Sequence, residues 1–122
     1  MAIKVLVADD AEVVLNGIRM ILGGNEEIQI IGEASSFSEA IGKSAELRPD
    51  VLVFDLHLAE GKSAELKSAV NGAKILAMSF AIDEEAEDLA KDIGAVKFLD
   101  KMELAQEMVP AIMQLASPRN HA

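Results

Sequence analysis

Five short runs of apolar residues recur along the chain, and each is followed by a segment with helical periodicity. The runs occupy Ile3–Ala8, Ile28–Ala34, Val51–Phe54, Lys74–Met78 and Ala95–Leu99. Apolar residues within them scarcely alternate with polar ones, which is typical of parallel strands that helices cover on both faces. The pattern therefore predicts an α/β domain of five βα units, doubly wound around a five-stranded parallel sheet.

The segments between the runs carry signals for helix ends. Ser36 and Glu39 have capping-box spacing at the start of the second helix, and Asp83 can cap the fourth. Gly23–Gly24 offers the left-handed conformation that ends a helix, and Gly94 offers it at the end of the fourth. The third and fifth helices are expected at Ser63–Val70 and Glu103–Ala116.

The length of 122 residues is enough for one domain with its own core. We expect this domain to span residues 1–116 and a frayed tail to follow over residues 117–122. The chain has no cysteine, which excludes disulfides and thiolate metal sites and fits a cytoplasmic setting. It has no apolar run of about 20 residues and no signal-peptide pattern, so we expect a soluble protein.

The net charge of −10 bears on which partners the chain can bind. So much negative charge repels phosphate backbones and anionic lipid surfaces, so the chain itself is not expected to bind nucleic acid or membranes. Trp and Tyr are absent and only four Phe residues supply rings. The stacking surfaces that nucleobases or a flavin use are therefore scarce.

Polar residues stand where four of the five apolar runs end. Asp9 and Asp10 follow the first run and Asp55 follows the third. Ser79 follows the fourth run, and Lys101 stands shortly after the fifth. In sheets of this kind, ligands bind in the crevice at the carboxyl ends of the strands. We therefore expect these side chains to form one site.

The residue types at the strand ends suggest phosphoryl chemistry. Carboxylates that lie close together raise one another's pKa values, so a cation is expected among them. Hard oxygen ligands at an open edge favour Mg²⁺ as that cation. Lys101 adds an ammonium suited to a phosphoryl oxygen. A carboxylate such as Asp55 can attack phosphorus in this setting and be held as an aspartyl-phosphate.

Each of these signals has an ordinary structural alternative when it is taken singly. Asp9–Asp10 could be a helix N-cap and its neighbour. Asp55 could form a structural ion pair with Lys101, and Ser79 could be a satisfied core hydroxyl. Their joint occurrence in one strand order favours a site.

The segments around these strand ends resemble those of a known protein family. The segments VADD, VFDLHL, AMSF and KFLDK resemble those of the receiver domain of bacterial two-component response regulators, over essentially the whole chain. Longer segments such as IIGEASSFSEAI and GAVKFLDK are most similar to receivers that precede a helix-turn-helix output domain. The resemblance implies a flavodoxin-like sheet with strand order 2-1-3-4-5.

The resemblance also implies how the acidic residues would act. Asp55 would be the phosphoacceptor and, with Asp10, a direct ligand of Mg²⁺. Asp9 would hold a metal-bound water, and His57 would contribute its backbone carbonyl to the metal.

Switch residues follow from the same resemblance. Ser79 and Lys101 would bind the phosphoryl group, and Phe98 would turn inward when Ser79 moves. The output surface would be the face of helix 4, strand 5 and helix 5, roughly Asp83–Ala116. Receivers usually have a small residue after the switch hydroxyl, but this chain has Phe80. We therefore expect Phe80 to restrict access to Asp55 and to slow turnover of the phosphorylated form.

The implied function is a signalling switch and not an enzyme with a separate substrate. A histidine kinase or phosphotransfer protein would donate the phosphoryl group, and the switched surface would control a partner or an output domain absent from this chain. This role is compatible with a homodimer. The main alternative is a receiver-like binding module that acts without phosphorylation. This alternative stays open because of Phe80, Ala59 and Ser63, where receivers commonly have a small residue, proline and glycine, respectively.

Two minor alternatives are disfavoured by the same strand ends. A flavin-binding protein would need amide and hydroxyl donors in the first βα turn, where this chain has Asp9 and Asp10. An aspartyl phosphatase would need a second acid two residues after Asp55, where this chain has His57.

Overall fold

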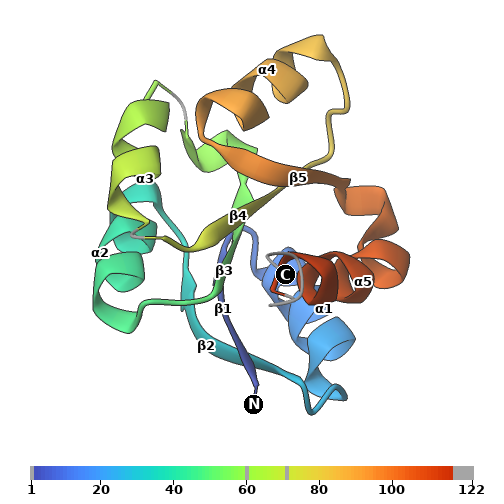
Figure 1. The fold of residues 1–122 in the computed structure, drawn as a ribbon. Helices are drawn as coiled ribbons and strands as arrows, with labels where there is room; N and C mark the ends of the chain where they lie inside the picture. The colour runs from blue at the N-terminus through green and yellow to red at the C-terminus, as the bar shows by residue number, and fades with distance from the viewer. Residues whose placement is uncertain (1, 60, 71, 117–122) are drawn as a thin grey trace.

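Strands and helices alternate from Ile3 to Leu115 in the computed structural model, which describes residues 2–59, 61–70 and 72–116 (Figure 1). The tail predicted over residues 117–122 lies outside the described residues. The elements are β1 Ile3–Ala8, α1 Glu12–Gly23, β2 Ile28–Ala34, α2 Phe37–Leu47, β3 Val51–Asp55, α3 Ser63–Ala69, β4 Lys74–Ser79, α4 Glu84–Asp92, β5 Ala95–Asp100 and α5 Leu104–Leu115. Two short 3₁₀ turns, Leu56–Ala59 and Lys101–Glu103, follow β3 and β5.

The five strands form one parallel sheet in the order β2-β1-β3-β4-β5 (Figure 1). This is the doubly wound α/β topology that the strand pattern and the resemblance predicted. The central strand β3 is buried along its whole length, which explains its uninterrupted apolar run. The edge strand β5 is more open, and Val96 is 57% exposed there.

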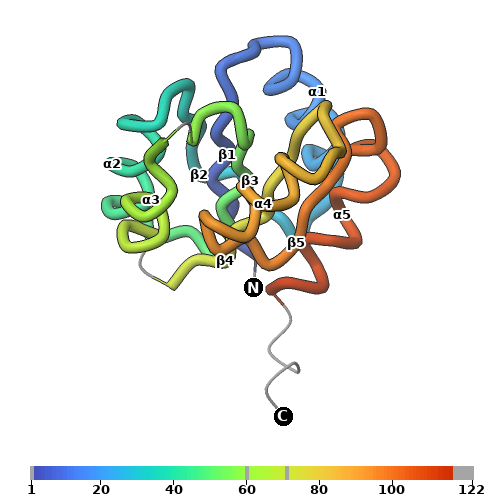
Figure 2. Tube along the Cα trace, turned by 90° about the horizontal axis from the view of Figure 1, so that it is seen from above, coloured from blue at the N-terminus to red at the C-terminus, as the bar shows by residue number. Residues whose placement is uncertain are grey.

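Two hydrophobic clusters lie on opposite faces of the sheet. Helices α1 and α5 cover one face through Ile18, Leu22, Met108 and Ile112, all at most 1% exposed. Helices α2, α3 and α4 pack against the other face, and Figures 1 and 2 show α2 and α3 side by side, across the sheet from α1 and α5. Each large side chain buried in this way contributes about 1.5 to 3 kcal/mol.

Most of the predicted helix ends are confirmed. The Ser36 hydroxyl caps α2 by accepting a hydrogen bond from the Glu39 amide at 3.1 Å, which is one half of a capping box. The Glu39 carboxylate accepts from the Ser35 amide at 2.6 Å instead of from the Ser36 amide. Asp83 caps α4 by accepting from the Ala86 amide at 2.9 Å. Gly94 follows α4 with a φ of 81°, in the region that glycine enters without strain.

The ends of α1 and α5 differ from the sequence prediction. Gly24 has a φ of −91°, so the left-handed end expected there is wrong. A turn closes α1 instead, in which the Asn25 amide donates to the Leu22 carbonyl at 3.1 Å, and this turn needs no positive φ. The fifth helix begins at Leu104, because the chain first makes the 3₁₀ turn Lys101–Glu103.

Candidate functional site

Strand ends position the candidate site residues. Asp9 follows β1, and its amide donates to the Ala34 carbonyl at 2.9 Å, which holds the end of β1 against the end of β2. Asp55 is the last residue of β3 and Ser79 the last of β4. Lys101 comes directly after β5, whose last residue pairs in register with Ser79. The parallel sheet therefore delivers all four residues to its carboxyl edge.

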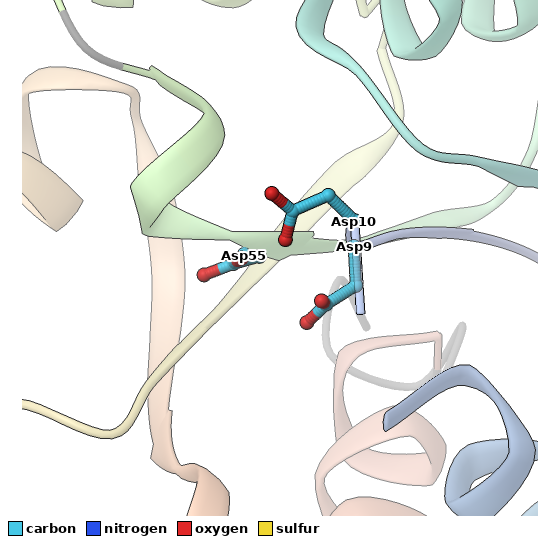
Figure 3. Close-up of side chains that lie close together, drawn as sticks. All are labelled: Asp9, Asp10 and Asp55. Carbon is cyan, nitrogen blue, oxygen red and sulfur yellow. The ribbon is translucent and has the colours of Figure 1, made fainter. Parts of the chain in front are cut away.

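Three carboxylates gather at the ends of the neighbouring strands β1 and β3. Asp9, Asp10 and Asp55 each offer an oxygen, and these oxygens lie within 4.8 Å of one another (Figure 3). Asp9 is fully buried and Asp55 is 4% exposed, whereas Asp10 is open to solvent. Two acids of this cluster are thus desolvated and one faces water.

Lys101 supplies the positive charge inside this cluster. Its ammonium lies 2.6 Å from Asp9 Oδ2 and 3.4 Å from Asp55 Oδ1, and its side chain is 6% exposed. The shorter contact shows that the main ion pair is with Asp9, although the sequence suggested Asp55 as the partner. One ammonium cannot balance three carboxylates, so the cluster keeps an excess of negative charge.

The environment of Asp55 favours its protonated form more than usual. Burial raises the pKa of the Asp55 carboxyl, and the nearby charge of Asp9 raises it further. A hydrogen bond from the His57 amide to Asp55 Oδ1 at 3.1 Å, together with Lys101, opposes this rise in pKa but does not cancel it. A further cation at the cluster would therefore stabilise the ionised carboxylate.

Asp9 does not cap α1. The N-cap residue of this helix is Ala11, which has no side-chain capping bond. Asp9 Oδ1 accepts instead from the Ala11 amide at 2.8 Å, within the turn that precedes the helix. The helix-cap alternative for Asp9–Asp10 is therefore wrong, and Asp9 Oδ2 is left facing Lys101.

Residues assigned to the switch lie around this cluster. The Ser79 hydroxyl is partly buried and accepts from the Ala81 amide at 3.0 Å, which ties it to the loop between β4 and α4. Phe98 on β5 is partly buried and packs against the core cluster under α4. It also lines a hollow of about 510 Å³ between α4 and β5. His57 is exposed in the turn after β3.

Phe80 makes a contact that sequence reasoning missed. Its side chain is 61% exposed, yet the Lys101 ammonium lies 5.1 Å from the centroid of its ring. This distance is within the range of a cation–π interaction. The sequence showed only that a bulky ring follows Ser79, and no local signal indicated which side chain the ring would contact.

The arrangement fits a divalent cation of the hard type. All of the clustered ligand atoms are carboxylate oxygens, and Asp10 keeps one side of the cluster accessible to water. Mg²⁺ typically takes one or two carboxylates and retains several waters. The fold and the site together define a doubly wound α/β domain with an acidic cluster and a lysine at the ligand-binding edge of its sheet.

Comparison with known proteins assigns the family. The family model described as "Response regulator receiver domain" matches residues 5–113. The chain therefore belongs to the receiver domains of two-component response regulators, as the resemblance of its strand-end segments predicted.

Relatives and solved structures agree with this assignment. The response regulator protein VraR of Staphylococcus epidermidis is 34% identical, and the match covers 92% of this chain and 56% of VraR. The chain thus spans about half the length of the curated relatives it matches. The receiver domain of a putative NarL response regulator from Mycobacterium tuberculosis superposes with a TM-score of 0.86 at 24% identity, covering 97% of this chain and 98% of that one.

A second solved structure shows the same fold. The response regulator domain of Thermotoga maritima CheB has a TM-score of 0.82 at 25% identity, covering 95% of this chain and 97% of that one. Among residues 2–59, 61–70 and 72–116, no helix is long and apolar enough to cross a membrane.

Proposed function

We propose that this receiver is a phosphorylation switch in which Asp55 accepts a phosphoryl group in a Mg²⁺-dependent reaction. The observation that carries the proposal is the cluster of Asp9, Asp10 and Asp55 at one sheet edge, with the Lys101 ammonium in contact with Asp9 and Asp55. Asp55 is the acid at the end of the central strand, and its carboxylate has Lys101 within 3.4 Å. A buried carboxylate beside cations is suited to attack on phosphorus.

The acidic residues divide into metal ligands and a nucleophile. Asp10 and Asp55 would ligate Mg²⁺ directly, the His57 backbone carbonyl would complete the protein ligands, and Asp9 would hold a metal-bound water. When bound, the ion offsets the charge of the carboxylates and of the phosphoryl group. The excess of acid over lysine in the cluster supports this assignment.

The phosphoryl transfer forms one bond and breaks another. An Asp55 carboxylate oxygen bonds to phosphorus while the bond from phosphorus to the donor's histidine nitrogen breaks, and that nitrogen leaves with its electron pair. Lys101 would then pair with the phosphoryl oxygens, and Ser79 would exchange its bond with the Ala81 amide for one to the phosphoryl group. Phe98 would turn inward as Ser79 moves, changing the face formed by α4, β5 and α5.

The partners follow from this role. A histidine kinase or phosphotransfer protein would supply the phosphoryl group, and the altered face would control an output protein or an output domain. One solved neighbour is described as an RcsB response regulator of Salmonella typhimurium with conformational dynamism for DNA interaction. The net charge of −10 argues that any DNA contact would come from another part of a longer protein and not from this domain. A homodimer through this domain is compatible with the same role.

The position of Phe80 favours one alternative function, which the same experiment tests. Its exposed ring lies 5.1 Å from the Lys101 ammonium, which itself contacts Asp55, so the ring would restrict access to Asp55 and slow turnover. If the restriction were complete, the domain would be a receiver-like binding module that acts without phosphorylation.

The test is intact-protein mass after incubation with Mg²⁺ and acetyl phosphate, followed by a phosphorylated histidine kinase as the donor. We expect a gain of one phosphoryl group that is lost in Asp55→Asn. Asp88→Asn is the matched control, because it removes the same charge from an exposed site on α4. No gain from either donor would refute the switch and favour the constitutive binding module.

A further inference from the structure

The Lys101 ammonium is held by two kinds of contact. Asp9 Oδ2 lies 2.6 Å away and Asp55 Oδ1 lies 3.4 Å away, which accounts for its acidic neighbours. The ring of Phe80 lies 5.1 Å away, as measured to its centroid. With these neighbours the lysine side chain is only 6% exposed, although Phe80 itself is 61% exposed. The Phe80 ring and the two carboxylates are thus among the groups that surround the ammonium.

Both oxygens of Asp9 are engaged in this arrangement. Oδ1 accepts from the Ala11 amide at 2.8 Å, and Oδ2 faces the ammonium. An ammonium held at Asp9 places a positive charge among the same carboxylates that would attract a divalent cation. The closer and more persistent this ammonium is, the weaker that attraction becomes.

We infer that Phe80 is a positioning residue for Lys101: its ring holds the ammonium on Asp9 in the unphosphorylated protein and thereby lowers the affinity of the acidic cluster for Mg²⁺. This inference rests on the proposed function for its metal and its phosphoryl group. It differs from steric restriction, because it depends on the π face of the ring and not on the volume of the side chain.

Substitutions at Phe80 separate these two roles. Phe80→Leu removes the ring but keeps apolar bulk, Phe80→Ala removes both, and Phe80→Trp keeps an aromatic face. We expect Leu and Ala variants to bind Mg²⁺ about two- to fivefold more tightly than the wild type, and the Trp variant to match or fall below the wild type, as loss or retention of a cation–π contact implies. Isothermal titration with MgCl₂ at constant ionic strength measures the affinity.

The ring contact itself has a spectroscopic signature. In NMR spectra of the wild type, the Lys101 side-chain protons should be shifted upfield by the Phe80 ring current, and Phe80→Leu should abolish that shift. This readout needs no metal and no phosphoryl donor. Because Phe80 is largely exposed, its substitution should leave the far-UV circular dichroism unchanged.

The chain supplies a matched control in a second lysine–ring pair. The Lys62 ammonium lies 5.4 Å from the centroid of the Phe37 ring, and neither residue belongs to the acidic cluster. Phe37→Leu should remove the ring-current shift of Lys62 while leaving Mg²⁺ affinity at the wild-type value.

Two results would overturn the inference. One is an affinity gain in Phe80→Ala that is absent from Phe80→Leu, since that would assign the effect to bulk. The other is a Lys101 signal that is the same in the wild type and in Phe80→Leu. Either result leaves the proposed switch standing if Asp55 is still phosphorylated. If Asp55 is not phosphorylated but the ring-current shift and the Mg²⁺ affinities are as expected, the proposed switch is refuted and the inference about Phe80 and Lys101 stands.

Discussion

Replacement of Asp55 by asparagine should stabilise the unphosphorylated, metal-free protein. Asparagine has nearly the same shape, and its side-chain oxygen can still accept from the His57 amide, which lies 3.1 Å from Asp55 Oδ1. Lys101 keeps its closer partner Asp9 at 2.6 Å, so the substitution leaves no buried cation without a counter-charge. What is removed is one of two buried acids that share a single ammonium.

The magnitude follows from the distances in the cluster. At an effective dielectric constant of about 20, the contact of 3.4 Å between Lys101 and Asp55 is worth about 5 kcal/mol of attraction. Asp9 and Asp10 each have an oxygen within 4.8 Å of an Asp55 oxygen. At this distance each of the two carboxylates repels Asp55 by about 3.5 kcal/mol, and solvent reduces the share of the exposed Asp10. These contributions nearly cancel, and the cost of burying the Asp55 charge remains. We expect Asp55→Asn to raise the free energy of unfolding by about 1 to 2 kcal/mol.

Urea and thermal unfolding at pH 7, followed by circular dichroism in the presence of EDTA, measure this difference. For a chain of this size, about 1 kcal/mol corresponds to a rise in Tm of about 3 to 6 °C. Asp88→Asn serves again as the control, because Asp88 is exposed and its neutralisation should change stability by no more than about 0.5 kcal/mol. Added Mg²⁺ should stabilise the wild type more than Asp55→Asn.

The pH dependence gives a second check on the same reasoning. Burial raises the pKa of Asp55 in the folded state, so the folded protein binds this proton more readily than the unfolded chain. The contribution of Asp55 to stability is therefore most favourable at low pH and is lost as pH rises through the raised pKa. The advantage of Asp55→Asn should shrink as pH falls. An asparagine variant less stable than the wild type at pH 7, or an advantage that grows in acid, would refute the argument.

Three further substitutions test the fold away from the cluster. Ser36→Ala removes the hydroxyl that accepts from the Glu39 amide and should cost about 1 kcal/mol in the free energy of urea unfolding. Gly94→Ala places a side chain at a φ of 81° and should cost about 1 to 2 kcal/mol by the same measurement, and an unchanged midpoint would contradict the strain. Arg19→Met removes the partly exposed side chain that pairs with Glu33 at 2.5 Å and with Glu12 at 3.1 Å. It should lower the urea midpoint at low salt and lower it less at 0.5 M NaCl, because salt screens surface ion pairs.

Sequence reasoning predicted the sheet, its helices and the residue types at the strand ends. The apolar runs are nearly continuous because helices cover β1, β3 and β4 on both faces. The burial of each strand can therefore be predicted from its own residues. Caps such as Ser36 and Asp83 are equally local, since each bonds an amide three residues ahead. The topology of parallel strands then requires their carboxyl ends to share one edge.

Contacts between those strand ends were decided by the tertiary structure alone. Whether the closer partner of Lys101 is Asp9 or Asp55 depends on a difference of less than 1 Å between two contact distances, which no local pattern encodes. The ring of Phe80 meets this lysine because the residues before them, Ser79 and Asp100, are paired in register at the ends of β4 and β5. At Gly24 a local signal was present but was not used. The glycine pair allowed a left-handed residue at the end of α1, but a turn through Asn25 ends the helix without one. Short-range propensities act over a few residues, whereas side chains from different strands meet only where the packed sheet places them.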